Sequence, residues 1–198
     1  KTAQPLKVIM YGDSQTGKTC FIKCIKDGRF EEDYCGTEEI EQTKMTTKVE
    51  GIEKNLIIFD VKGEALFGTG VTVTKYGTSG KLHIFMIPQV SPAGKASYIN
   101  GVKRFIQMND FIAAINPMHL VFVANFSDVG HNDLEEIKAY AEQMGAMFFD
   151  LNLKDVESTQ KAFNEMLVEC MKKTGEIKVK GKKSSKKSED KKGSCMIL

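Results

Sequence analysis

The sequence predicts an α/β fold in which helices flank a mostly parallel, doubly wound sheet. Three observations predict it. Several short runs are almost wholly apolar, as strands buried on both faces are. Helical patterns, with apolar residues three and four positions apart, separate these runs. The alternation continues for about 150 residues, and the 198-residue chain, 41% hydrophobic, suffices for one such domain with an appendage.

The expected strands are apolar runs of strand length bounded by turn signals. They span residues 6–10, 55–60, 82–87, 120–124 and 147–149. Glycine and charged residues mark a turn at Glu50-Gly51, ahead of the second strand. We expect each strand to contribute to a single sheet.

The expected helices span residues 18–26, 97–115, 132–144 and 156–172. Pro117 closes the second helix, because proline cannot continue it. Asn132-Asp133 predicts a capped start for the third helix. Residues 66–81, with four glycines among Thr and Val, are a poor helix former, and we expect a mobile loop there.

Composition excludes several classes of protein. The longest uncharged run, residues 111–127, includes Asn, Pro and His, so no segment is apolar enough to cross a bilayer. Nothing near the start resembles a secretory signal, and because the chain begins at Lys1, we expect the true N-terminus to lie upstream. Five cysteines without paired spacing predict a reducing compartment and no disulfide framework.

The charge is unevenly distributed along the chain. Residues 172–198 carry ten lysines against three acidic residues, or +7, so the body carries −5 of the total of +2. A mildly acidic body disfavours nucleic-acid binding, whereas a basic tail favours an anionic partner. After Lys173 apolar residues nearly vanish, and such a tail cannot bury enough surface to order itself.

A phosphate-binding motif follows the first strand and opens the first helix. The segment GDSQTGKT fits GxxxxGK[ST], in which glycines let backbone N–H groups curl around an anion and the helix dipole adds to the attraction. Lys18 is expected to reach the β- and γ-phosphates, and the Thr19 hydroxyl to ligate Mg²⁺. The expected nucleotide contacts are Gly12, Asp13, Ser14, Gln15, Thr16, Gly17, Lys18, Thr19 and Cys20.

Around this motif the chain resembles the Ras superfamily of small GTPases, nearest to its Ras and Rab branches. The segment KVIMYGDSQTGKTCFIKCIKDGRF looks like the first strand, phosphate loop and first helix of that family. The resemblance runs with breaks from residue 7 to 172 and resumes at the last four residues. It implies a P-loop NTPase fold of six strands and five helices, a GTPase domain at residues 5–172, a flexible basic tail at 173–198, and a GDP/GTP switch with Mg²⁺.

The resemblance assigns two switch segments. In the first, Phe30 would pack on the guanine and Thr37 would ligate Mg²⁺, although Gly36 replaces the usual proline. In the second, Asp60 would hold Mg²⁺ through water and the Gly63 N–H would bond the γ-phosphate. The expected metal ligands are therefore Thr19, Thr37 and Asp60.

Two departures fall in the second switch. Lys62 replaces the usual alanine, and Glu64 replaces the glutamine that orients the attacking water. A carboxylate cannot donate a hydrogen bond to the γ-phosphate, so Glu64 is expected to slow hydrolysis. The expected catalytic residues are Lys18, Gly63 and Glu64.

Two further segments resemble the guanine-recognition motifs of the family. Asn125 and Asp128 match NKxD, with Phe126 where the lysine stands, and Asp128 would accept hydrogen bonds from guanine. Asn152, Leu153 and Lys154 align with the Ser-Ala-Lys of a later loop. There Leu153 would offer its N–H to the guanine oxygen if its side chain fits.

The chain ends Cys-Met-Ile-Leu, a prenylation motif whose final leucine favours geranylgeranylation of Cys195. One lipid chain binds a bilayer only marginally, and each nearby lysine adds ~1 kcal/mol at an anionic leaflet. Six lysines lie just upstream: Lys182, Lys183, Lys186, Lys187, Lys191 and Lys192. This pair of signals predicts anchorage at the cytoplasmic face of the plasma membrane or an endomembrane.

Two interpretations stay open. One is a membrane-anchored, monomeric guanine-nucleotide switch in signalling or vesicle trafficking, a slow Mg²⁺-dependent GTPase with effector, exchange-factor and GTPase-activating partners. The other is a nucleotide-poor pseudoGTPase that serves as an interaction scaffold, which Lys62, Glu64, Phe126 and Leu153 favour. A small P-loop kinase fits poorly, because it needs several lid arginines and the chain has only Arg29 and Arg104.

Overall fold

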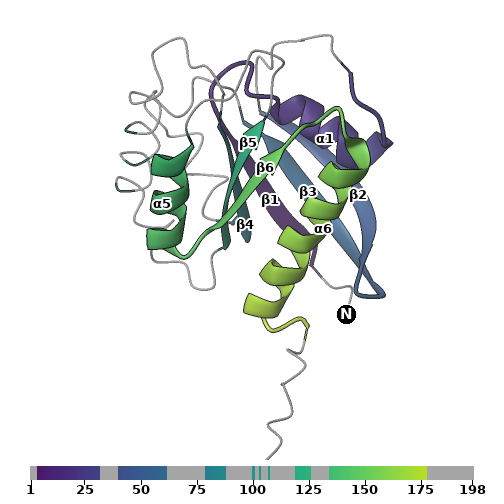
Figure 1. Cartoon of the computed structure of the whole chain (residues 1–198). Coiled ribbons are helices and arrows are strands. Elements are labelled where there is room, and N and C mark those ends of the chain that lie inside the picture. The colour runs from purple at the N-terminus through teal and green to yellow at the C-terminus, as the bar shows by residue number, and fades with distance from the viewer. Residues whose placement is uncertain are drawn as a thin grey trace, which may run out of the picture.

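The structure is a computed structural model of the chain, and it describes residues 4–31, 40–61, 79–87, 119–125 and 134–177, with single helical residues at 100, 103 and 107. Figure 1 shows the arrangement. The elements in chain order are β1 (Leu6–Tyr11), α1 (Lys18–Asp27), β2 (Glu41–Val49), β3 (Ile52–Asp60), β4 (Leu82–Ile87), β5 (His119–Asn125), α5 (Glu135–Met144), β6 (Met147–Leu151) and α6 (Val156–Lys173).

The strands form one six-stranded sheet in the order β2-β3-β1-β4-β5-β6. Only the β2–β3 pair is antiparallel. The predicted α/β fold with a mostly parallel six-stranded sheet is confirmed. Because all the other neighbours are parallel, the carboxyl ends of β1, β3 and β5 meet at one edge of the sheet, where ligands bind in open α/β sheets.

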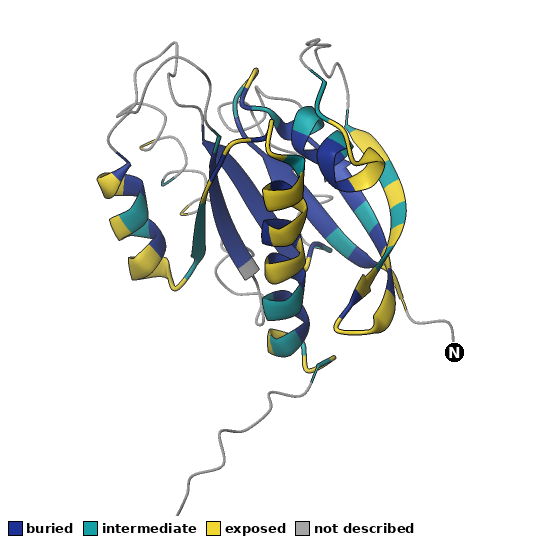
Figure 2. Ribbon diagram, turned by 45° about the vertical axis from the view of Figure 1, so that its right-hand side comes forward, coloured by how far each residue is buried: buried dark blue, intermediate teal, exposed yellow. Residues whose placement is uncertain are grey.

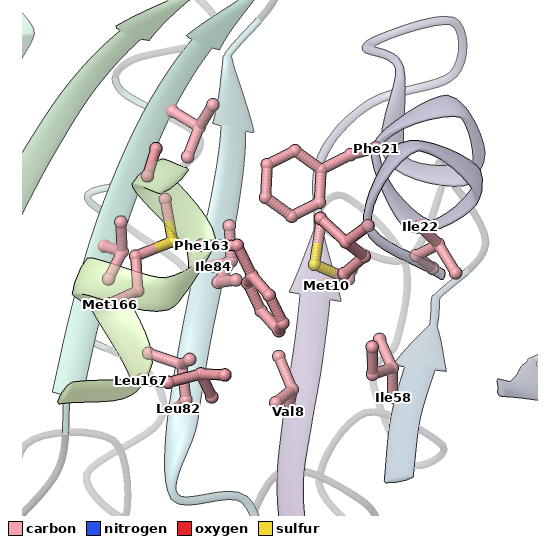
Figure 3. Close-up of a cluster of buried hydrophobic side chains, with 14 of the residues drawn as sticks. Val8, Met10, Phe21, Ile22, Ile58, Leu82, Ile84, Phe163, Met166 and Leu167 are labelled. Atoms are coloured by element: carbon pink, nitrogen blue, oxygen red, sulfur yellow. The ribbon is translucent and has the colours of Figure 1, made fainter. Parts of the chain in front are cut away.

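Both faces of the sheet are buried, as its apolar strands require. On one face, side chains of β1, β3 and β4 meet apolar residues of α1 and α6, among them Phe21, Phe163 and Met166 (Figure 3). On the other face, an aromatic cluster built on Phe85 and Phe122 packs against α5. Strands β1, β4 and β5 are buried along almost their whole length, whereas the outer surface of α6 is exposed (Figure 2).

Strand β2 lies at an edge of the sheet and was not expected as an element of its own. Its sequence, EQTKMTTKV, is polar except for Met45 and Val49, and exposed residues alternate with partly buried ones along most of its length. The turn predicted at Glu50-Gly51 is confirmed: it joins β2 to β3, with φ values of 49° and 79°. Two successive positive φ values suit the twist of a two-residue hairpin.

The remaining element boundaries differ from the prediction by a few residues. Helix α5 begins at Glu135, three residues later than predicted, with Leu134 at its N-cap and no side-chain cap bond. Asn132 and Asp133, the predicted cap, lie outside the described residues. Only three single residues of the helix predicted at 97–115 are described. Most of the loop predicted at 66–81 also lies outside the described residues.

Helix α6 is predicted to end at residue 172, and it extends one residue further. The helix ends at Lys173, and Ile177 still packs against the hydrophobic core. No helix within the described ranges is both long and apolar enough to span a membrane. Residues 178–198, which include Cys195 and the six lysines before it, lie outside the described part.

Candidate functional site

The segment from Gly12 to Gly17 joins the carboxyl end of β1 to the amino end of α1 and requires glycine at both ends. Gly12 has a φ of 153°, and a Cβ there would lie 2.6 Å from Thr16 Oγ1 and 2.8 Å from the Met86 carbonyl oxygen. Gly17, at φ 92°, lies so close to Asn125 that a Cβ would come within 2.6 Å of its Nδ2. Side chains are therefore excluded at these two positions by contact as well as by backbone conformation.

Internal hydrogen bonds hold the loop in a curled shape. Thr16 Oγ1 donates to the Asp13 carbonyl at 3.0 Å, and the Ser14 N–H donates to Asp13 Oδ1 at 2.8 Å. Gln15, at the exposed tip, has a φ of 63°, a conformation that a residue with a side chain rarely adopts. Strain of this kind is stored where a loop must present its backbone to a ligand.

Lys18 lies over this loop. Its Nζ donates to the carbonyl oxygens of Gly12 at 3.1 Å and Asp13 at 2.9 Å. Burial lowers the pKa of the Lys18 ammonium, and the charges of Asp60 and Asp13 act in the opposite direction. A buried cation therefore lies against the loop backbone, where it can act with the loop N–H groups on a bound phosphate.

Thr19 and Asp60 meet beside the loop. The Thr19 hydroxyl donates to Asp60 Oδ2 at 2.6 Å, and Asp60, at the carboxyl end of β3, is almost fully buried. A hydroxyl and a carboxylate suit Mg²⁺, which prefers oxygen ligands and binds through one or two protein oxygens together with substrate phosphates. Two of the three expected metal ligands are thus adjacent, while Thr37 lies outside the described residues.

Asn125 lies at the carboxyl end of β5 and connects this strand to the loop through a partly buried side chain. Its Nδ2 donates to the Thr16 carbonyl at 3.4 Å, and its buried Oδ1 accepts no hydrogen bond from any described residue. Asn125 therefore supports the loop, whereas Phe126 and Asp128, the expected base-binding residues that follow it in the sequence, lie outside the described part.

Leu153 is part of the hydrophobic core and packs close to Gly17 at the end of the loop. Its side chain is 1% exposed, and its Cδ1 would lie 3.0 Å from a Cβ placed on Gly17. The N–H of Leu153 donates to no group in the described part of the chain. The substitution of leucine for the family's alanine is thus accommodated by inward packing.

The loop around Leu153 is built as a polar turn and tied to α1. Asn152 Oδ1 accepts from the Lys154 N–H at 3.0 Å, and Asp155 then caps α6 by accepting from the Ser158 N–H. The Leu153 carbonyl accepts from Cys24 Sγ at 3.4 Å. No sequence pattern predicts this tie, because Cys24 occupies an ordinary apolar position of the helix.

Phe30 follows α1, is half buried and packs against the hydrophobic core. Its neighbour Glu31 contacts α1 through both its side chain and its carbonyl oxygen. The other expected site residues, Lys62, Gly63, Glu64 and Cys195, lie outside the described residues. Among the described residues no group of three or more His, Cys, Asp or Glu could hold a further metal ion.

Comparison with known proteins agrees with this geometry. A sequence model of the Ras family matches residues 7–172. The chain belongs to the Ras family. The match covers all the strands except the first residue of β1, and it includes the loop, Thr19, Asp60, Asn125 and Leu153.

Ras-family relatives resemble the chain at low identity. The Ras-related protein RABD2a of Arabidopsis thaliana is 26% identical over 163 residues, which cover 81% of this chain and 77% of the relative. The GTP-binding protein YPTM1 of Zea mays is also 26% identical over 163 residues, covering 81% of this chain and 75% of its own. At this identity the Ras-family chain is a divergent member, in keeping with the departures in its motifs.

Proposed function

We propose that this Ras-family chain is a guanine-nucleotide-dependent molecular switch. The observation that carries the proposal is the contact between Thr19 and Asp60 at the mouth of the loop that Lys18 covers. In the proposed complex the loop N–H groups and the Lys18 ammonium bind the phosphates, and Thr19, Thr37 and Asp60 hold Mg²⁺. When bound, the ion neutralises charge on the β- and γ-phosphates.

We propose that the part of the site next to the loop, which includes Asn125 and Leu153, prefers guanine. Asn125, which supports the loop, is followed by Asp128, whose carboxylate pairs with the two N–H donors of guanine. The Leu153 N–H, which donates to no described group, supports a contact with the guanine oxygen. Phe30 is proposed to pack on the purine.

Hydrolysis is proposed to be slow. Glu64 stands where the family has the water-orienting glutamine, and intrinsic rates in this class are ~10⁻⁴ s⁻¹ even with glutamine. The chain carries only two arginines, so the arginine that stabilises the transition state is proposed to come from an activating partner. Geranylgeranylation of Cys195, with the lysine-rich tail, is proposed to anchor the chain at a membrane.

A titration of the full chain tests nucleotide binding. Fluorescent GDP is titrated with and without Mg²⁺, and unlabelled GTP, GDP and ATP compete for the site. The proposal predicts Mg²⁺-dependent binding, displacement by both guanine nucleotides and resistance to ATP, with binding lost in Lys18→Ala and retained in Lys26→Ala. Absence of binding in the unmodified chain favours the second candidate, a pseudoGTPase scaffold, to which the four motif departures point.

A further inference from the structure

We propose that Glu31 is a positioning residue that clasps the start of the first switch segment to α1 and so slows nucleotide release. The inference rests on the proposed function, because the group it positions is Phe30, the proposed purine contact. We call Cys20, Lys23, Arg29 and Glu31 the Glu31 clasp.

Three contacts converge on Glu31. Its carboxylate forms an ion pair with Lys23, and its Oε1 lies 2.8 Å from Arg29 Nη2. Its carbonyl oxygen accepts a hydrogen bond from Cys20 Sγ at 3.3 Å. Side chain and backbone of the same residue are therefore both held.

The clasp draws its anchors from one face of α1. Cys20 and Lys23 are three positions apart, so their side chains lie on neighbouring turns of the same face. Cys20 directly follows Thr19, and Arg29 directly precedes Phe30. The clasp thus links the metal-binding end of the site to the residue expected to contact the base.

Holding Glu31 restricts Phe30. The two residues share a planar peptide unit, so fixing the Glu31 backbone limits the directions in which the Phe30 ring can leave the core that it packs against. If the clasp opens, Phe30 keeps its apolar contact but loses this restraint. Release of the nucleotide, which requires Phe30 to move, then becomes faster.

The electrostatics keep the clasp closed near neutral pH. The hydrogen bond from Lys23 lowers the pKa of the Glu31 carboxyl, and the charge of Arg29 acts in the same direction. The side chains of Lys23 and Glu31 are 33% and 30% exposed, so salt screens their attraction. Breaking a partly exposed ion pair of this kind is expected to change the rate of nucleotide release by a few-fold and not by orders of magnitude.

Release of preloaded fluorescent GDP from the full chain tests the clasp. Lys23→Met and Glu31→Gln are each expected to speed release by about two- to fivefold, and the double variant is expected to be no faster than the faster single one. Lys26→Met is the matched control, because it removes the same charge from the same helix and Lys26 forms no ion pair with any described residue. Added salt is expected to speed release more in the unmodified chain than in Lys23→Met, in which only the pair of Arg29 with Glu31 remains to be screened.

Two results would overturn the inference. One is equal release rates for Lys23→Met and Lys26→Met; the other is additive effects in the double variant. Failure of the proposed function gives a different result, because the unmodified chain would then bind no GDP at all. In that case the proposed role of Glu31 in nucleotide release fails together with the proposed function. Amide hydrogen exchange at Phe30 and Glu31, compared between the unmodified chain and Lys23→Met, then decides whether Lys23 holds the backbone.

Discussion

The hydroxyl of Thr19 donates a 2.6 Å hydrogen bond to Asp60 Oδ2, across 41 residues of sequence. The contact joins the first turn of α1 to the carboxyl end of β3. It brings together two residues that sequence motifs had assigned separately to one metal ion, and it lies beside the loop that Lys18 covers. Their proximity supports a single composite site.

Replacement of Thr19 is expected to weaken Mg²⁺ binding. Thr19→Ala removes the proposed hydroxyl ligand, and even loss of an indirect metal contact costs about tenfold in metal affinity. Nucleotide release measured against Mg²⁺ concentration is therefore expected to need at least about tenfold more Mg²⁺ for the same retention. Thr47→Ala, on strand β2, is the control. An unchanged Mg²⁺ dependence in Thr19→Ala would exclude this residue as a ligand.

Replacement of Gly17 is expected to destabilise the fold through a collision. Gly17→Ala forces a side chain into φ 92° and places its Cβ 2.6 Å from Asn125 Nδ2. Gly145→Ala is the matched control, since Gly145 has φ 65° and nothing within 4 Å of the added carbon. Strain alone costs ~1 kcal/mol, and the collision adds ~1–3 kcal/mol at position 17. Urea unfolding of both variants measures the difference, and equal losses would show that Asn125 simply moves aside.

The buried pair of Tyr11 and His83 predicts a loss of stability at acidic pH. Their side chains lie 3.1 Å apart, Tyr11 Oη to His83 Nδ1, and burial lowers the pKa of His83 from 6.5 to about 4. The unfolded chain takes up a proton on His83 as the pH falls through 6.5, whereas the folded chain does so only near 4. Stability from this group is therefore complete above pH 6.5 and falls by ~2 kcal/mol between pH 7 and pH 5.

Urea unfolding at pH 7 and pH 5 checks this effect. His83→Phe lacks the titrating group, so it is expected to lose ~2 kcal/mol less than the unmodified chain over this interval. The comparison cancels the contribution of the carboxylates, which are common to both proteins. An identical pH dependence in the two proteins would contradict the assignment.

Replacement of Glu176 is expected to destabilise the fold, because it leaves the buried Lys54 ammonium without its partner. Lys54, on β3, has a side chain only 8% exposed, and it pairs with Glu176 just beyond α6. Glu176→Gln leaves that charge without its partner, which is expected to cost ~1–3 kcal/mol, since Glu176 itself is 38% exposed and water can reach the pair. Glu169→Gln, which breaks an exposed pair with Lys172, is expected to cost at most ~1 kcal/mol. Similar losses in the two variants, measured by thermal unfolding, would argue against burial as the cause.

The elements with strong local signals could be predicted from sequence. Strands β1 and β4 are apolar runs with one polar residue each, Lys7 and His83, and the loop before Lys18 has fixed spacing, so these signals do not depend on distant residues. Strand β2 could not be predicted in this way. It is an edge strand with one exposed face, and its polar residues leave no apolar run to recognise.

The site could be predicted only where its chemistry is local. Lys18 and Thr19 follow from the loop motif, whereas the inward packing of Leu153 depends on the missing side chain of Gly17, far away in sequence. The tie from Cys24 to the Leu153 carbonyl and the ion pair of Lys23 with Glu31 likewise depend on how the helix lies against the loops. Contacts of this kind leave no spacing pattern in the sequence.

The nucleotide content of the purified chain tests the central proposal most directly. The full chain is purified without added nucleotide and denatured, and the released small molecules are separated by ion exchange against guanine and adenine standards. The proposed site around Lys18, Thr19 and Asp60 predicts about one guanine nucleotide per chain, with a share of GTP raised by the glutamate at position 64. A chain that releases no nucleotide, and that takes up none when loaded with GTP and Mg²⁺, would contradict the proposed switch.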